Sequence, residues 1–163
     1  MLRQLMVGPP PLTLAVAESM TGGRVQALIT AEAGASEFFL GGITAYTLAQ
    51  KVRHLGVGRH AAEAVDCVSA EIARQMARGA CALFEADIAV ATTGYAEPAP
   101  VRGFAEPGVF WALCRRVPVG EEVWREGFLR LAGLDRAAAQ DRAAREVVTE
   151  LAKYLQRWRA AGA

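Results

Sequence analysis

Apolar residues along the chain fall into short continuous runs that alternate with helically spaced stretches. Runs at residues 12–17 and 87–93 are bounded by polar residues or glycine and predict buried strands. Further strands are predicted at 41–46, 109–114 and 123–131, with residues 117–120 as the turn of an antiparallel hairpin. Because strands and helices interleave, we expect an α/β fold, a single-domain layered α/β/α sandwich with a mixed sheet.

Helical spacing occupies the segments between these strands. It predicts helices from residue 21 or 22 to about 30, over 47–55 with Gly56 as the stop, and from Ser69 as N-cap. The connection 57–68 leaves room for a short helix at residues 59–64. Residues 37–39 leave room for a short helical piece. A final helix runs from its N-cap Asp135 to about residue 158.

The chain of 163 residues is long enough for one domain with a full core. Prolines at positions 9–11 make residues 1–11 a stiff lead-in, and residues 159–163 are expected to form a loose tail. The N-terminus lacks the pattern of a signal peptide, and no apolar run is long enough to span a membrane. These features predict a cytoplasmic protein without a membrane partner.

Charge and cysteine usage exclude several classes of function. The net charge of +1 provides no field for recruiting nucleic acid. Cys67, Cys81 and Cys114 are far apart and form no C-x-x-C pair, so a zinc site or disulfide framework is not expected. The two histidines, His54 and His60, lie in a basic stretch without metal-ligand spacing and are expected to be solvated. We therefore predict no metal and no cofactor.

Two strand exits contain small polar residues and glycine, and both are candidate ligand sites. The first, residues 18–23, joins a strand to a helix, and the second is the segment 92–94. Ligands bind at the carboxyl ends of strands in open α/β sheets, so the exits could form two walls of one pocket. Helix N–H groups at the first exit suit an anion. It matches neither the dinucleotide nor the Walker pattern, and a tight turn without ligand is the alternative.

Ser36, Tyr46 and Lys51 form a second candidate constellation. A lysine held neutral can deprotonate a serine hydroxyl, and a tyrosine can relay the proton. Serine–lysine pairs are a variant of acyl-transfer chemistry. The alternative is a loop serine, a half-buried tyrosine and a surface lysine without a joint role.

The motifs together resemble the CinA C-terminal domain family, whose stand-alone members are nicotinamide mononucleotide amidases. The resemblance covers residues from about 12 to 155. Residues 17–23 (AESMTGG) resemble the family's AESCTGG, and 34–36 (GAS) stand where it has GSS. Residues 41–46 and 51–57 resemble its GG..xY....K..LGV, 68–80 its VS....A..MA.GA helix, and 93–94 the start of its TGIAGP.

The resemblance implies hydrolysis of the nicotinamide mononucleotide carboxamide to nicotinic acid mononucleotide and ammonia. It assigns Ser36 as nucleophile, Lys51 as base and Tyr46 as proton relay, without a metal. The expected partners are a small-molecule nucleotide substrate and further copies of the chain in a homo-oligomer. The implied substrate-binding residues are Glu18, Ser19, Thr21, Gly22, Gly23, Thr44, Thr93, Gly94 and Arg136.

The sequence departs from the family pattern at several places around this site. Met20 replaces a cysteine, Leu48 replaces an asparagine and Gln140 replaces an arginine. Glu97 and Ala99 stand at positions that are glycine in the family, and Glu97 adds bulk and negative charge near the presumed phosphate. An alternative to the amidase is therefore a catalytically weakened or inactive nucleotide-binding or regulatory homologue. A third reading, an interaction module, rests on the three tryptophans and the abundant alanine.

Overall fold

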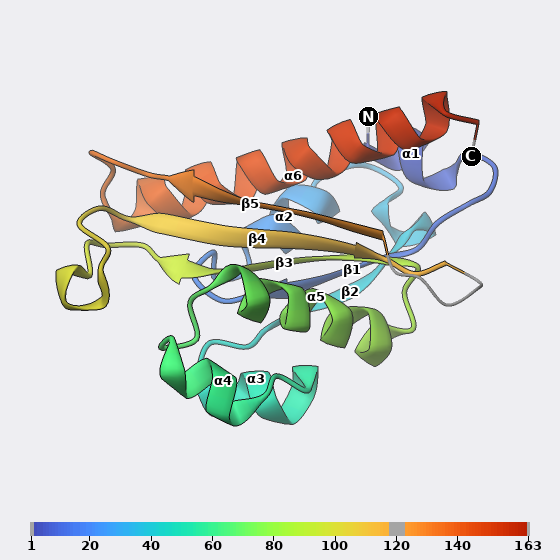
Figure 1. Ribbon diagram of the computed structural model, residues 1–163. Helices are drawn as coiled ribbons and strands as arrows, with labels where there is room; N and C mark the ends of the chain where they lie inside the picture. Colours follow the sequence, from blue (N-terminus) through green and yellow to red (C-terminus); the bar gives the residue numbers. More distant parts are fainter. Residues whose placement is uncertain (1, 118–122, 163) are drawn as a thin grey trace.

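The computed structural model describes residues 2–117 and 123–162, which form three layers around one mixed sheet (Figure 1). The sheet has five strands in the order β2-β1-β3-β4-β5. Strand β1 pairs in parallel with β2 and β3, whereas β3–β4 and β4–β5 are antiparallel. The strands are β1 (Leu14–Glu18), β2 (Phe39–Thr44), β3 (Ile88–Tyr95), β4 (Gly108–Arg115) and β5 (Val123–Arg130). The predicted α/β/α sandwich with a mixed sheet is confirmed.

Helices cover both faces of the sheet. In Figure 1, α6 and α2 lie on one face, and α5 lies on the other with α3 and α4 beyond it. Short 3₁₀ turns η1 (Ala35–Glu37) and η2 (Pro100–Arg102) lie in the connections. The helices are α1 (Leu2–Val7), α2 (Arg24–Thr30), α3 (Leu48–Leu55), α4 (Arg59–Ala64), α5 (Ala70–Phe84) and α6 (Arg136–Ala160).

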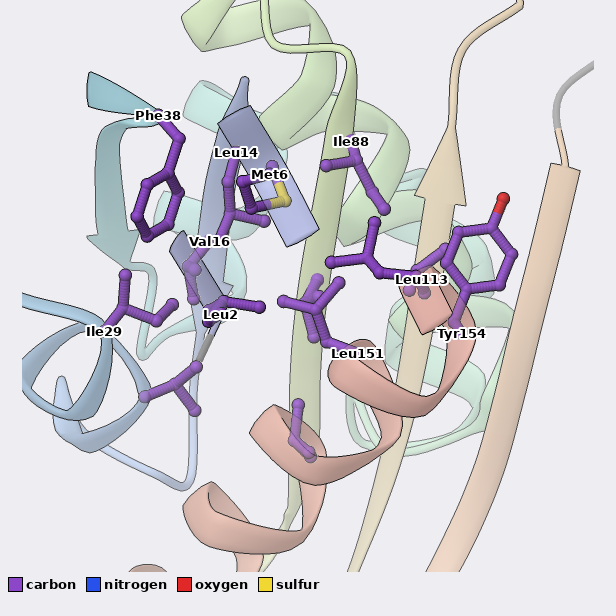
Figure 2. Close-up of a cluster of buried hydrophobic side chains, with 14 of the residues drawn as sticks. Leu2, Met6, Leu14, Val16, Ile29, Phe38, Ile88, Leu113, Leu151 and Tyr154 are labelled. Atoms are coloured by element: carbon purple, nitrogen blue, oxygen red, sulfur yellow. The ribbon is translucent and has the colours of Figure 1, made fainter. Parts of the chain in front are cut away.

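Side-chain size differs between the two faces of the central strands. On the α6 face, large residues such as Leu14, Val16 and Ile88 form one core cluster (Figure 2). On the α5 face the same strands present alanines, for example Ala15 and Ala17, against further alanines of α5. Small side chains on both partners let α5 lie close to the sheet, which accounts for the alanines in this cluster.

The helix ends follow the predicted signals. The Ser69 hydroxyl accepts a hydrogen bond from the Ile72 N–H at 3.2 Å, and the Asp135 carboxylate accepts one from the Ala138 N–H at 2.8 Å. Gly56 ends α3 with a positive φ of 63°, a conformation that glycine adopts without steric cost. The short helix in the connection is also present, as α4.

The N-terminal segment and the C-terminal residues differ from the expected lead-in and loose tail. Residues 2–7 form helix α1, and its Leu2 and Met6 are buried in the α6-face cluster (Figure 2). Helix α6 continues to Ala160, and the Arg159 guanidinium donates hydrogen bonds to the carbonyls of Leu5, Pro9 and Pro10 at 2.7–3.0 Å. The proline run therefore connects α1 to β1 while Arg159 holds its carbonyls.

The strands on either side of the loop after the second buried strand extend further into it than predicted. Strand β3 continues to Tyr95 and β4 begins at Gly108, because these residues pair with each other across the antiparallel ladder. An isolated bridge between Ala99 and Phe104 closes the loop around η2. The predicted hairpin of β4 and β5 is confirmed, but most of its predicted turn, residues 118–120, lies outside the described residues. Within the described residues, no helix combines the length and apolar character that crossing a membrane requires.

Candidate active site

The carboxyl ends of the neighbouring parallel strands β1 and β3 converge on the first predicted strand exit. Ser19 directly follows β1, and a turn at 20–23 leads into α2. Gly22 and Gly23 have φ values of 60° and 94°, which a side chain with Cβ rarely adopts. This strand–turn–helix geometry presents Ser19 at a sharp corner and resembles the nucleophile elbow of α/β-hydrolases.

Lys51 of α3 meets the hydroxyl of Ser19. The Nζ atom of Lys51 lies 2.8 Å from Ser19 Oγ and donates a second hydrogen bond to the Tyr46 carbonyl at 3.2 Å. Lys51 is only 1% exposed and Ser19 7%. Burial disfavours the ammonium form and lowers the pKa of Lys51, while Cys67 and Asp66 act in the opposite direction. A neutral amine at this position can take the proton of the serine hydroxyl.

Ser36, the serine assigned as nucleophile from the sequence, does not join this pair. It lies in η1, at the amino end of β2, and is exposed. Lys51 lies beyond the opposite end of that parallel strand, whose six residues span about 16 Å. The predicted convergence of Ser36 with Lys51 is therefore not present within the chain, because the strand separates them.

Tyr46 is also placed differently from the predicted relay. Its hydroxyl accepts a hydrogen bond from the Arg136 guanidinium at 2.8 Å, and its side chain is exposed. Its contact with Lys51 is made by the backbone carbonyl alone. Tyr46 thus orients the lysine through the main chain while its ring borders the solvent.

Glu18 occupies the helix N-terminus that was expected to face an anion. Its fully buried carboxylate accepts hydrogen bonds from the N–H groups of Gly23, Val25 and Gln26 at 2.9–3.2 Å. The Thr21 hydroxyl donates a further bond to the same carboxylate at 2.6 Å and lies 2.8 Å from the Thr92 hydroxyl. Glu18 and Thr21 therefore build the turn, since their polar atoms are engaged with the protein itself.

The remaining predicted residues differ in whether they make contacts within the protein or lie exposed at the site. Thr93 donates from its hydroxyl to the Cys67 carbonyl at 2.7 Å, and Gly94 lets β4 approach so closely that a Cβ there would lie 2.2 Å from the Gly108 carbonyl oxygen. Thr44 is exposed at the end of β2, with its hydroxyl beside Gly23. Of these residues, Thr44 lies at the surface of the site and Gly94 lines the adjoining pocket.

A pocket of about 210 Å³ adjoins the Ser19–Lys51 pair through Met20 and Tyr46. Arg136, the first residue of α6, lines it opposite Glu97 from the loop after β3. The guanidinium Nη1 donates to the Glu97 carboxylate at 2.6 Å, and this hydrogen bond is the largest of the interactions that raise the pKa of Arg136. Glu97 has no left-handed φ, so the loop takes this conformation without a glycine here.

Several residues of the site were missed or misjudged from the sequence. Gln140, which replaces an arginine in the family pattern, donates its amide to the Met20 carbonyl at 2.8 Å and so fixes the residue after Ser19. Met20 itself is buried in a small core cluster. Asp66 and Cys67 both have a left-handed φ, of 51° and 63°, a strained arrangement for residues with Cβ. No local sequence signal indicates the contact between Gln140 and Met20, because the two residues are distant along the chain.

The side chains that could bind a metal are His, Cys, Asp and Glu, and the structure shows how they are arranged. Among residues 2–117 and 123–162 there is no group of three or more His, Cys, Asp or Glu side chains that could hold an ion. Cys81 and Cys114 are buried, and the Cys81 thiol donates to the Cys114 carbonyl at 3.7 Å, whereas Cys67 is partly buried. His54 and His60 are exposed.

The model of the CinA C-terminal domain matches residues 8–155 of the chain. A CinA-like protein of Chlorobium limicola is 38% identical over 152 residues, covering 93% of this chain and 35% of that protein. A putative competence-damage inducible protein of Halalkalibacterium halodurans is 39% identical over 148 residues, covering 90% of this chain and 34% of that protein. The chain thus spans about a third of the length of these curated relatives.

Solved structures share the fold over almost the whole chain. A competence or damage-inducible protein from Enterobacter asburiae superposes with a TM-score of 0.82 at 30% identity, covering 94% of this chain and 93% of that one. The competence damage-inducible protein A from Klebsiella pneumoniae gives a TM-score of 0.81 at 28% identity, covering 95% and 91%.

Proposed function

Because the chain belongs to the CinA C-terminal domain family, we propose that it is an amidohydrolase acting on nicotinamide mononucleotide or a related pyridine compound. The observation that carries this proposal is the buried contact of 2.8 Å between Lys51 Nζ and Ser19 Oγ at a strand exit beside a pocket. A serine with an adjacent amine of lowered pKa is suited to acyl transfer from an amide.

The proposed reaction proceeds through an acyl-enzyme. Neutral Lys51 takes the hydroxyl proton of Ser19 while Oγ attacks the carboxamide carbon and forms a C–O bond. The Lys51 ammonium then returns that proton to the amide nitrogen, so that the C–N bond breaks and ammonia leaves. Lys51, neutral again, takes a proton from water, whose oxygen attacks the ester carbon. The bond from that carbon to Ser19 Oγ then breaks, the Lys51 ammonium returns the proton to Oγ, and the carboxylic acid leaves. The hydrogen bond to the Tyr46 carbonyl keeps Nζ directed at Ser19 throughout.

The test is ammonia release from a panel of nicotinamide compounds by the wild type, Ser19→Ala, Lys51→Met and Ser36→Ala. We expect both Ser19→Ala and Lys51→Met to lose at least about 10³-fold in kcat/KM, since they remove nucleophile and base. Ser36→Ala is the matched control, a hydroxyl removed from the opposite edge of the sheet, and it should keep wild-type activity. Circular dichroism establishes that each variant is folded. Loss of activity in folded Ser36→Ala, or full activity in Ser19→Ala, refutes this assignment.

A second candidate function is a binding or regulatory module without turnover. The observation that favours it is the hydrogen bond from the Arg136 guanidinium to the Glu97 carboxylate, because this cation faces the pocket and is already paired within the protein. Calorimetry on the wild type distinguishes the two candidates. Heat of binding without ammonia formation across the panel supports the module, and turnover excludes it.

A further inference from the structure

Arg136 is held by two partners on opposite sides of the pocket mouth. Its Nη1 atom donates to Glu97 Oε2 at 2.6 Å, and its Nη2 atom donates to the Tyr46 hydroxyl at 2.8 Å. Glu97 and Tyr46 come from different connections, one after β3 and one after β2, so Arg136 joins two walls of the site. Among the described residues that line this pocket, Arg136 is the one Lys or Arg side chain.

This pairing removes the group that an anionic ligand would need. An arginine recognises phosphate with its two terminal N–H groups acting together, and here both terminal nitrogens already donate to protein oxygens. A phosphate that displaced Glu97 would still lie beside the displaced carboxylate. Repulsion between two unit charges about 4 Å apart weakens binding by a factor of about 5 in water and several hundred at a lower effective dielectric.

The Glu97 carboxylate offers other ligands a favourable contact. Its side chain is 63% exposed, and a carboxylate oxygen can accept further hydrogen bonds besides the one from arginine. Vicinal ribose hydroxyls are donors that carboxylates bind in nucleotide sites. A positively charged pyridinium ring is also attracted to this carboxylate. The pocket volume of about 210 Å³ is below the range of about 300–1,000 Å³ usual for drug-sized ligands, which fits a smaller molecule.

We propose that Glu97 is a specificity-determining residue that excludes the 5′-phosphate, so that the site takes a pyridine-carboxamide riboside in preference to its phosphorylated form. This inference rests on the proposed amidohydrolase function for the identity of the ring. The charge discrimination itself is a property of the Glu97–Arg136 pair and is measurable by binding alone.

The experiment compares nicotinamide riboside with nicotinamide mononucleotide by calorimetry, in the whole 163-residue chain carrying Ser19→Ala so that neither compound is consumed. We expect the riboside to bind at least about 10-fold more tightly in this background. Adding Glu97→Gln should move the ratio of the two dissociation constants at least about 10-fold toward the mononucleotide. The gain should shrink as salt rises, because this pair is exposed.

Two further variants separate specificity from a general charge effect. Glu37→Gln removes one carboxylate from another exposed pair, with Arg3, at the opposite edge of the sheet, and should leave the ratio unchanged. Arg136→Gln should alter the ratio less than about 3-fold alone, but abolish the gain when combined with Glu97→Gln. A riboside preference that is absent, a ratio that Glu97→Gln leaves unchanged, or no binding of either compound overturns the inference.

Failure of the proposed function gives a different result. If the binding ratio shifts as expected but the enzyme with Ser19 intact releases no ammonia from either compound, the amidohydrolase proposal fails and the charge discrimination stands. If ammonia is released but the ratio does not respond to Glu97→Gln, the inference about Glu97 fails alone.

Discussion

Replacing Glu18 by glutamine tests whether this residue builds the strand exit or binds the substrate. The substitution preserves shape, but it removes the negative charge and turns one acceptor oxygen into an N–H donor. The carboxylate accepts from Thr21, Gly23 and Val25 on Oε2 and from Gln26 on Oε1. A glutamine that keeps its oxygen toward the first group must direct its NH₂ at the Gln26 N–H, where two donors then oppose each other.

The magnitude follows from these contacts. A hydrogen bond to a charged group contributes about 1.5–3 kcal/mol, and a negative charge at a partly buried helix N-terminus contributes up to about 2 kcal/mol. Because three of the bonds persist in weaker neutral form, we expect a loss of about 3 kcal/mol in the free energy of unfolding. For a domain of this size, that corresponds to a decrease in Tm of about 6–12 °C.

Urea denaturation followed by circular dichroism measures this loss, with Glu37→Gln as the matched control. Glu37 forms an exposed pair with Arg3, so its substitution should change the free energy of unfolding far less than Glu18→Gln does. The structural reasoning is refuted if Glu18→Gln is as stable as this control. A changed KM at unchanged stability would instead restore Glu18 to the substrate-binding role assigned from the sequence.

Three other predictions concern the site and the termini. The kcat/KM of the wild type should rise with pH and reach a plateau, because Lys51 must be neutral to act as the base. The apparent pKa of this rise should lie below the ordinary lysine value of about 10.4, because burial favours the neutral amine. A value of kcat/KM that falls over this pH range contradicts the assigned base. Lys51→Met should be inactive yet at least as stable as the wild type near pH 7. Its advantage in unfolding free energy should decrease as pH rises from the lowered folded pKa toward 10.4, since over that window the unfolded lysine is protonated and the folded one is not; equal pH dependence in both proteins would refute this. Arg159→Ala should destabilise the protein by about 1–3 kcal/mol and speed proteolysis of residues 2–11, because it removes the donor to the Leu5, Pro9 and Pro10 carbonyls; unchanged proteolysis would show that α1 is held by its apolar contacts alone.

Local signals predicted the elements well because the relevant interactions are themselves local. Ser69 and Asp135 cap helices through N–H groups three residues ahead, and Gly56 ends one through its own φ. Helix α1 was not predicted, because its six residues are too short to show a periodic pattern. Its stability depends on Leu2 and Met6 packing into a core built by distant strands.

For the candidate site, the sequence indicated the position of the strand exit but not the contacts that its residues make. The strand exit and the pocket beside it lie where the glycines indicated. Glu18 and Gln140 nevertheless have structural roles, because their partners belong to a helix N-terminus and to a carbonyl 120 residues away. Such pairings depend on how the elements pack, and neither composition nor spacing contains that information.

The two serines illustrate how topology decides which side chains meet. Ser19 and Ser36 both precede Lys51 in the chain, and Ser36 is the nearer of the two in sequence. In a parallel β-α-β unit, however, residues that follow one strand lie beside residues that follow the next, and those that precede a strand lie at the other edge. Ser19 follows β1 and Lys51 follows β2, so the fold brings these two together across 32 residues. Ser36 precedes β2, so any function of its hydroxyl in this chain belongs to the opposite edge of the sheet.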